Sequence, residues 1–231
     1  MFRFIADNQH LLLQLALKQL GLSAIAIAIS LVIALPLAVW LGHIHRGSFV
    51  AINVGNVGRA LPTLAVLAIG LAWLGLGKTH VLIALVILAV PPMLTYAYTA
   101  VDGVDRDVVD AARGMGMREI QILFKVELPL ALPVIFAGVR AAALFVVATA
   151  TIASVAGYSG TLGDIIANQA SFRFSGVEGA SLCVTVLAVV VNGFFAALQR
   201  VVTPRGLRAR TATRPQRTPS LVTAGAAGAA G

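Results

Sequence analysis

Few side chains of this 231-residue chain have types and spacing suited to catalysis or metal binding. His43 and His45 lie two residues apart, which would point them to different sides of a helix, and His10 and His80 are isolated. We expect a solvated turn around the pair, with metal binding as the alternative. Cys183 is the only cysteine, so a disulfide framework and a thiolate metal cluster are excluded. No catalytic triad or dyad is suggested, and we expect that the chain is not an enzyme.

Residues 72–79, AWLGLGKT, are one residue short of a phosphate-binding loop, because Ala72 stands where that pattern needs glycine. Such a loop follows a buried strand and opens a helix. This segment instead joins two apolar stretches, and no acidic partner for a magnesium ion is near. We predict a tight turn rather than a nucleotide site.

Residues 110–129, DAARGMGMREIQILFKVELP, form a charged segment in an otherwise apolar chain. Of the 26 Lys, Arg, Asp and Glu residues in the sequence, six fall within it. Acidic residues lie at the start of residues 105–113, where the positive end of a helix dipole would stabilise them. Gly114 and Gly116 then interrupt the pattern. The segment is expected to begin as a short helix that ends at a glycine hinge.

A second short helix is predicted over residues 118–127, with four apolar side chains among the charged ones. These are Ile120, Leu123, Phe124 and Val126. Pro129 and Pro133 are expected to end it, because proline disrupts a helix interior. An apolar stripe surrounded by charge suits a groove on a soluble partner. The alternative is an amphipathic loop on lipid headgroups, which six acidic residues between Asp102 and Glu127 disfavour.

The composition places this segment on a membrane protein. Hydrophobic residues make up 59% of the chain and charged residues 11%, whereas soluble proteins have about 25% charged residues. A membrane-spanning helix needs about 20 mostly apolar residues. Five such stretches are predicted, at residues 21–41, 60–76, 81–100, 132–155 and 180–202. We expect an all-α integral membrane protein with about five transmembrane helices.

The two ends of the chain differ from this apolar part. Residues 1–20 mix leucine with polar residues and are interpreted as an interfacial segment; the alternative is that the first helix starts earlier and tilts. Residues 21–203 would form the membrane domain. Residues 204–231 are rich in Arg, Thr, Pro, Ala and Gly, which predicts a disordered basic tail.

Lysine and arginine predict the orientation, because they favour the cytoplasmic side. Five spans put the termini on opposite sides. A cytoplasmic C-terminus places twelve basic residues inside and four outside. The inner set is Arg46, Arg59, Arg106, Arg113, Arg118, Lys125, Arg200, Arg205, Arg208, Arg210, Arg214 and Arg217; the outer set is Arg3, Lys18, Lys78 and Arg173. The N-terminus is therefore expected outside, and the charged loop, about residues 102–130, in the cytoplasm. The net charge of +8 is a topology signal rather than a nucleic-acid site.

The charged loop carries a spaced motif. Its members are Asp110-Ala111-Ala112, Gly116, Val126 and Leu128-Pro129. This arrangement resembles the Glu-Ala-Ala, Gly, Ile, Leu-Pro pattern of permease subunits in binding-protein-dependent ABC importers, with Asp for Glu and Val for Ile. Both substitutions preserve charge or shape.

Three further segments are similar to one branch of that family, the permeases for glycine betaine, choline and related osmoprotectants. They are RALPTLAVLAIGLAWLGLG (59–77), ELPLALPVIFAGVRAA (127–142) and VAGYSGTLGDIIANQ (155–169). One departure concerns the third span. Such permeases often have Arg-Asn-Thr after its last proline, where this chain has Met93-Leu94-Thr95-Tyr96.

The resemblance implies an inner-membrane half-channel that pairs with a second permease, identical or homologous. Two ATPase subunits would dock on the charged loop and hydrolyse ATP, and an extracytoplasmic binding protein would deliver the solute. This chain itself would bind no cofactor and no nucleic acid. Closure of the ATPases would switch which side of the path is open.

Polar residues within the spans are candidates for the translocation path. They are Tyr96, Tyr98, Arg140, Thr149 and Asn192. Arg140 is a functional candidate as an intramembrane charge, but snorkelling to the cytoplasmic face is favoured. The others could instead form interhelical hydrogen bonds. Alternative functions are a permease for an amino acid or another small polar nutrient, and a membrane scaffold or half of a secondary carrier outside the ABC class.

Overall fold

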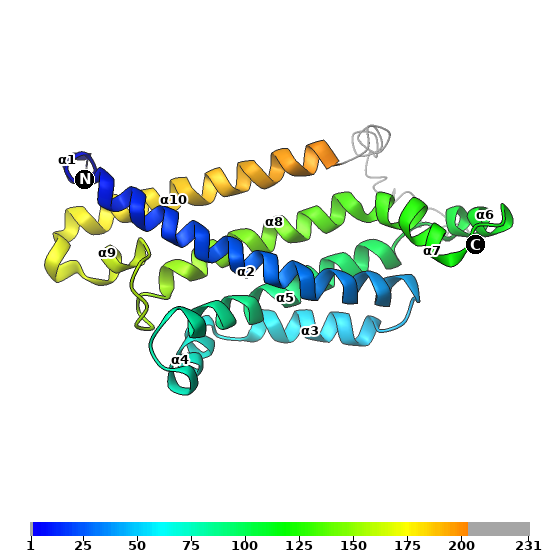
Figure 1. Ribbon diagram of the computed structural model, residues 1–231, viewed down its shortest axis with the longest axis horizontal. Helices are drawn as coiled ribbons and strands as arrows, with labels where there is room; N and C mark the ends of the chain where they lie inside the picture. The colour runs from blue at the N-terminus through cyan, green and yellow to red at the C-terminus, as the bar shows by residue number, and fades with distance from the viewer. Residues whose placement is uncertain (1, 203–231) are drawn as a thin grey trace, which may run out of the picture.

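The computed structural model describes residues 2–202, and every regular element in that range is a helix (Figure 1). In chain order these are α1 (Phe2–Asp7), α2 (Gln9–His43), α3 (Ser48–Ala60), α4 (Thr63–Leu74), α5 (Lys78–Asp102), α6 (Arg106–Gly114), α7 (Glu119–Ile122), the π-helix η1 (Leu123–Glu127), α8 (Leu128–Ile152), α9 (Gly163–Ala167) and α10 (Gln169–Val202). The predicted tail at 204–231 lies outside the described residues.

Four stretches are long and apolar enough to cross a membrane. They are α2, α5, α10 and the helix Glu119–Ile152, which α7, η1 and α8 form together. The pair α3 and α4 satisfies the same criterion but is bent by 86°. The described chain thus has four spans, or five if the bent pair is one span, as predicted. The charged loop projects from one end of the bundle, and α1 and α9 lie at the other (Figure 1).

The first span is longer than the predicted stretch 21–41. α2 has 35 residues and begins at Gln9, which gives it a length of about 52 Å. The helix therefore starts earlier than residue 21, and the interfacial position of residues 1–20 stays a prediction. α1 is a separate short helix, and its Phe4 ring packs edge-on against Phe172.

The second span differs from the prediction of one apolar stretch at 60–76. Residues 48–60, which precede that stretch, form α3, and the chain then turns sharply at Leu61 and Pro62 into α4. Proline forces the residue before it out of the helical region, and Leu61 is extended (φ −66°, ψ 118°). Residues 75–77 beyond α4 form the predicted turn into α5, with Gly75 and Gly77 at positive φ.

α5 is the central helix and packs against α2, α3, α4 and α8. The core around it is rich in alanine, namely Ala26, Ala34, Ala38, Ala84, Ala89, Ala97, Ala142, Ala143 and Ala150. Small residues let membrane helices approach closely, and dispersion contacts then hold them together. At Gly138 of α8 an added Cβ would overlap Tyr96 of α5, and at Gly58 of α3 it would overlap Pro91.

The last span begins earlier than the predicted residue 180. α10 starts at Gln169 and is interrupted at Arg173, whose φ of 58° and ψ of 176° are not helical. Much of its length past the kink is exposed, including Val186, Val190 and Phe194. α10 is therefore held to the bundle mainly along α8 and α9.

Gly138→Ala should separate α5 from α8 and lower stability by about 1–3 kcal/mol, as overpacking does. Gly193→Ala in α10 is the matched control, because no atom lies within 4 Å of the added methyl group. Thermal unfolding of the purified protein in detergent measures both variants. Equal melting temperatures would contradict the close α5–α8 contact.

Candidate functional site

The charged loop begins with α6, whose N-terminus is capped as predicted. The Asp105 carboxylate accepts a hydrogen bond from the backbone N–H of Asp107 at 3.0 Å. Asp107 itself lies in the first turn. Both acids therefore stabilise the positive end of the helix dipole.

α6 ends in a Schellman motif built on Gly116. The Gly116 N–H donates to Arg113 O at 2.9 Å, and the Met117 N–H donates to Ala112 O at 3.2 Å. This geometry needs a residue in the left-handed backbone conformation, and Gly116 has a φ of 81°. Gly114 is helical, so the predicted hinge lies at Gly116 alone.

A small hydrophobic cluster fixes how the motif residues face. Val104, Val109, Ala112 and Ile122 are buried together, with Met117 and Val126 packed against them. Ala112 and Val126 of the motif thus point into the loop, whereas Asp110, Ala111 and Gly116 are exposed. Leu128 and Pro129 are half-buried at the start of α8.

The predicted stop at Pro129 and Pro133 is wrong, because the helix continues through both prolines. Proline disrupts an α-helix when its ring meets the carbonyl four residues earlier. The π-helical turn over Leu123–Glu127 widens the backbone just ahead of Pro129. This wider turn contains Lys125, whose carbonyl lies four residues before Pro129, and the helix continues from Glu119 to Ile152.

The exposed apolar stripe also differs from the predicted set. Leu123 is buried and Val126 is half-buried, whereas Ile120 and Phe124 are exposed. Val108 and Met115 add exposed apolar side chains from α6 and the turn after it. The outer surface of the loop is therefore apolar at these four positions and charged between them.

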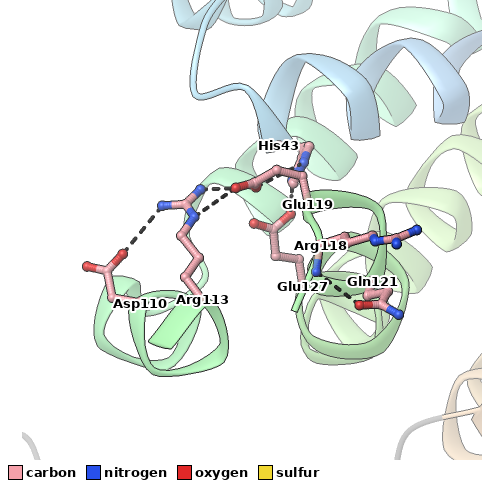
Figure 2. Close-up of polar contacts among 7 residues, drawn as sticks. All are labelled: His43, Asp110, Arg113, Arg118, Glu119, Gln121 and Glu127. Atoms are coloured by element: carbon pink, nitrogen blue, oxygen red, sulfur yellow. Dashed lines mark hydrogen bonds and ion pairs between the residues drawn. The ribbon is translucent and has the colours of Figure 1, made fainter. Parts of the chain in front are cut away.

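Arg113 joins α6 to α7. Its Nε donates to Glu119 Oε1 at 2.9 Å and its Nη2 donates to Glu119 Oε2 at 3.1 Å, and Asp110 lies 3.4 Å from Nη1 (Figure 2). The hydrogen bond to Glu119 raises the pKa of the Arg113 guanidinium above its ordinary value. This two-point contact fixes the orientation of α6 better than a single bond would.

Glu127 joins the loop to the end of α2. Its Oε2 lies 2.6 Å from His43 Nδ1, and His43 Nε2 lies 3.8 Å from Glu119 Oε2 (Figure 2). Glu127 is 1% exposed, and its Oε1 has no hydrogen-bond partner among the described residues. A buried carboxylate with one partner depends on that partner. His43 therefore connects α2 to the whole set of ionic contacts in the loop.

The predicted turn is present at Ile44 and His45, but His43 lies in α2 and each of the two histidines has a carboxylate partner. His45 Nδ1 lies 2.8 Å from Asp102 Oδ1, so both imidazoles pair with carboxylates. The partners are 57 and 84 residues away in sequence, and local spacing could not reveal them. The described residues contain no group of three or more His, Cys, Asp and Glu side chains that could hold a metal ion.

The predicted path residues do not form one site. Tyr98 and Thr149 are buried, and Tyr96 is partly exposed and packs against Gly138. Arg140 and Asn192 are brought together, since Arg140 Nε donates to Asn192 Oδ1 at 2.6 Å. Arg140 lies thirteen residues from Glu127, about 20 Å along the helix, and its snorkelling stays a prediction.

Gln19 is a buried polar residue that sequence analysis missed. Its Nε2 donates to Val147 O at 3.0 Å and to Thr151 Oγ1 at 2.8 Å, and its Oε1 accepts from the Leu162 N–H at 3.1 Å. It thus ties α2 to α8 and to the loop before α9. The sequence contained one signal for this residue, a glutamine within an apolar helix.

Comparison with known proteins identifies the class. Residues 34–207 match the family described as "Binding-protein-dependent transport system inner membrane component". The chain therefore belongs to this family, and it is a membrane-embedded permease subunit of an ABC importer rather than an enzyme. ATP is used by the partner ATPase of such importers, and a binding protein serves as a further partner.

Several proteins resemble the chain over most of its length. The glycine betaine/carnitine/choline transport system permease protein OpuCB of Bacillus subtilis is 34% identical over 90% of this chain and 96% of its own. The carnitine transport permease protein OpuCB of Listeria monocytogenes is 35% identical over 89% of this chain and 94% of its own. Among solved structures, a chain of the MetNI methionine ABC transporter in an inward-facing conformation has a TM-score of 0.74 and 20% sequence identity. The match covers 86% of this chain and 99% of that chain, and it shows that the two share a fold.

Gly116→Val should distort the end of α6, because a β-branched residue strongly disfavours positive φ. We expect faster backbone hydrogen exchange across α6 and its turn. Gly114→Ala is the matched control, since Gly114 is helical and has nothing within 4 Å of an added Cβ. Equal exchange in the two variants would rule out the conformational requirement.

His43→Ala should destabilise the protein by about 3 kcal/mol, because it leaves Glu127 buried without its partner. Removing both side chains in the double variant with Glu127→Ala should cost less than His43→Ala alone. Thermal unfolding of the four proteins forms a double-mutant cycle. Additive losses would show that the two groups do not interact energetically.

Proposed function

We propose that this chain forms half of the translocation path for a compatible solute such as glycine betaine, choline or a related osmoprotectant. The functions named for its relatives support this substrate class. They include the OpuCB proteins above, the choline permease OpuBB of Bacillus subtilis and the osmoprotectant import permease OsmW of Salmonella typhimurium. The other half would be a second permease, identical or homologous, and two ATPase subunits would complete the importer.

The charged loop would be the docking element for the ATPase. Its exposed surface combines Val108, Met115, Ile120 and Phe124 with surrounding charges. Such a pattern suits a groove on a soluble partner. Ala111 and the turn glycine Gly116 add no bulk to this surface, so a partner could approach the α6 backbone closely. In this arrangement the loop and the C-terminus face the cytoplasm and the N-terminus faces outward.

The ionic contacts suggest how ATPase movement would reach the membrane helices. A displacement of α6 would pull on Glu119 through Arg113, and then on His43 and α2. The continuous helix from Glu119 to Ile152 would carry the same displacement into α8. Rigid helices that rotate together match a two-state rocking motion. Tyr96, Tyr98, Thr149, Arg140 and Asn192 remain the candidate path residues.

Ala111→Glu and Gly116→Asp should each abolish uptake while membrane insertion stays intact, because they place a charged side chain on the docking surface. Ala111 is an exposed helical residue, so folding should tolerate Ala111→Glu. Gly116→Asp also strains the left-handed turn, so Ala111→Glu is the variant that separates docking from folding. Co-purification of the Walker-motif ATPase in detergent measures docking. Ala167→Glu is the matched control, an exposed helical alanine at the opposite end of the bundle.

Normal ATPase retention and uptake in both loop variants would overturn the docking assignment. Uptake of an amino acid, with no uptake of glycine betaine or choline, would instead preserve docking and replace the substrate class. If the chain were a membrane scaffold outside the ABC class, altering the loop would change neither solute uptake nor ATPase retention.

A further inference from the structure

Arg140 lies at the midpoint of α8, twelve residues from both Leu128 and Ile152. It faces α10, where its Nε donates to Asn192 Oδ1 at 2.6 Å. Seven residues away on each helix, Gln199 Nε2 donates to Pro133 O at 2.8 Å. A spacing of seven residues returns to the same helix face. Both contacts therefore lie along the seam between α8 and α10, two helices long and apolar enough to cross a membrane.

The sequence offers no acid at this depth. Its nine acidic residues are Asp7, Asp102, Asp105, Asp107, Asp110, Glu119, Glu127, Asp164 and Glu178. On the two helices concerned, the nearest are Glu127 and Glu178, about 20 Å from Arg140 and Asn192 along each helix. The remaining acids belong to the charged loop or to α1 and α9 at the other end. A second copy in the same orientation would place its acids at the same depths.

The pair presents hydrogen-bond donors without an acceptor. Arg140 Nη1 and Nη2 and Asn192 Nδ2 have no hydrogen-bond partner among the described residues, because Nε and Oδ1 form the contact between them. The two Nη groups form a planar fork that matches a carboxylate. An anionic group with two oxygens would satisfy these donors and neutralise the positive charge of Arg140, which is half-buried.

We propose that Arg140 and Asn192 bind the carboxylate of the transported solute in mid-membrane. This inference rests on the proposed function and narrows it to zwitterions that carry a carboxylate as well as a quaternary ammonium group, such as glycine betaine. Choline has a hydroxyl group in place of the carboxylate. Its positive charge would meet the guanidinium without compensation, so this site disfavours it.

The test uses the complete importer, with its ATPase and binding protein, in proteoliposomes. ATP-driven uptake of labelled glycine betaine and choline is compared for wild type, Arg140→Gln and Arg140→Lys. Arg140→Gln should lower glycine betaine uptake at least tenfold and change choline uptake less than twofold. Arg140→Lys keeps the charge but loses the two-point fork, so it should lower glycine betaine uptake less than Arg140→Gln does. Each variant's uptake of a solute is divided by the wild-type uptake of the same solute. The binding protein's own preference between the two solutes then cancels. Arg46→Gln, at an exposed arginine outside the helices, is the control.

Three outcomes would overturn the carboxylate site while leaving the proposed function intact. They are unchanged glycine betaine uptake in Arg140→Gln, equal loss of both solutes, and equal behaviour of the Gln and Lys variants. If wild type carries glycine betaine but no choline, the measurement is glycine betaine taken up per ATP hydrolysed. A structural defect would lower this value equally in the Arg140→Gln and Arg140→Lys variants, and only unequal losses support the carboxylate site. A wild type that carries neither solute contradicts the proposed function itself.

Discussion

The buried contact between Glu127 and His43 is the interaction on which the attachment of the charged loop depends. A carboxylate at this degree of burial needs a compensating group, and the described residues provide only the imidazole at the end of α2. From there the ionic contacts continue through Glu119 to Arg113 and α6. The loop is therefore attached both covalently, through η1 and α8, and ionically, through α2.

The membrane part is held together in a different way. Around α5 the contacts are made by alanine and glycine, and hydrogen bonds such as those of Gln19 are few. Dense packing of small residues makes each helix move as a unit rather than bend locally. A loop attached to two long helices at once can therefore transmit a displacement over the length of the bundle. This is the mechanical property that a permease driven by a soluble ATPase requires.

Local patterns predicted much of this architecture. The apolar stretches indicated the spans, the acids before Asp110 indicated the start of α6, and the Gly116 turn followed from a glycine hinge. Predictions failed where a distant part of the chain decides the outcome. α3 is rich in glycine and asparagine, and its Gly55 and Gly58 lie close against Thr95 and Pro91 of α5, which local pattern does not record. Pro129 failed as a helix stop for a local reason, because a π-helical turn precedes it.

The sequence by itself determined the class of protein, the number of apolar stretches and the motif in the charged loop, because these depend on residue type and short spacing. Tertiary structure decided which side chains meet. His43 finds Glu127 across 84 residues, and Arg140 finds Asn192 across 52. Such pairs arise when separate helices come to lie side by side, and no local periodicity records that arrangement. The same packing also decided that Ala112 is buried in the charged loop while Ala111 beside it faces outward.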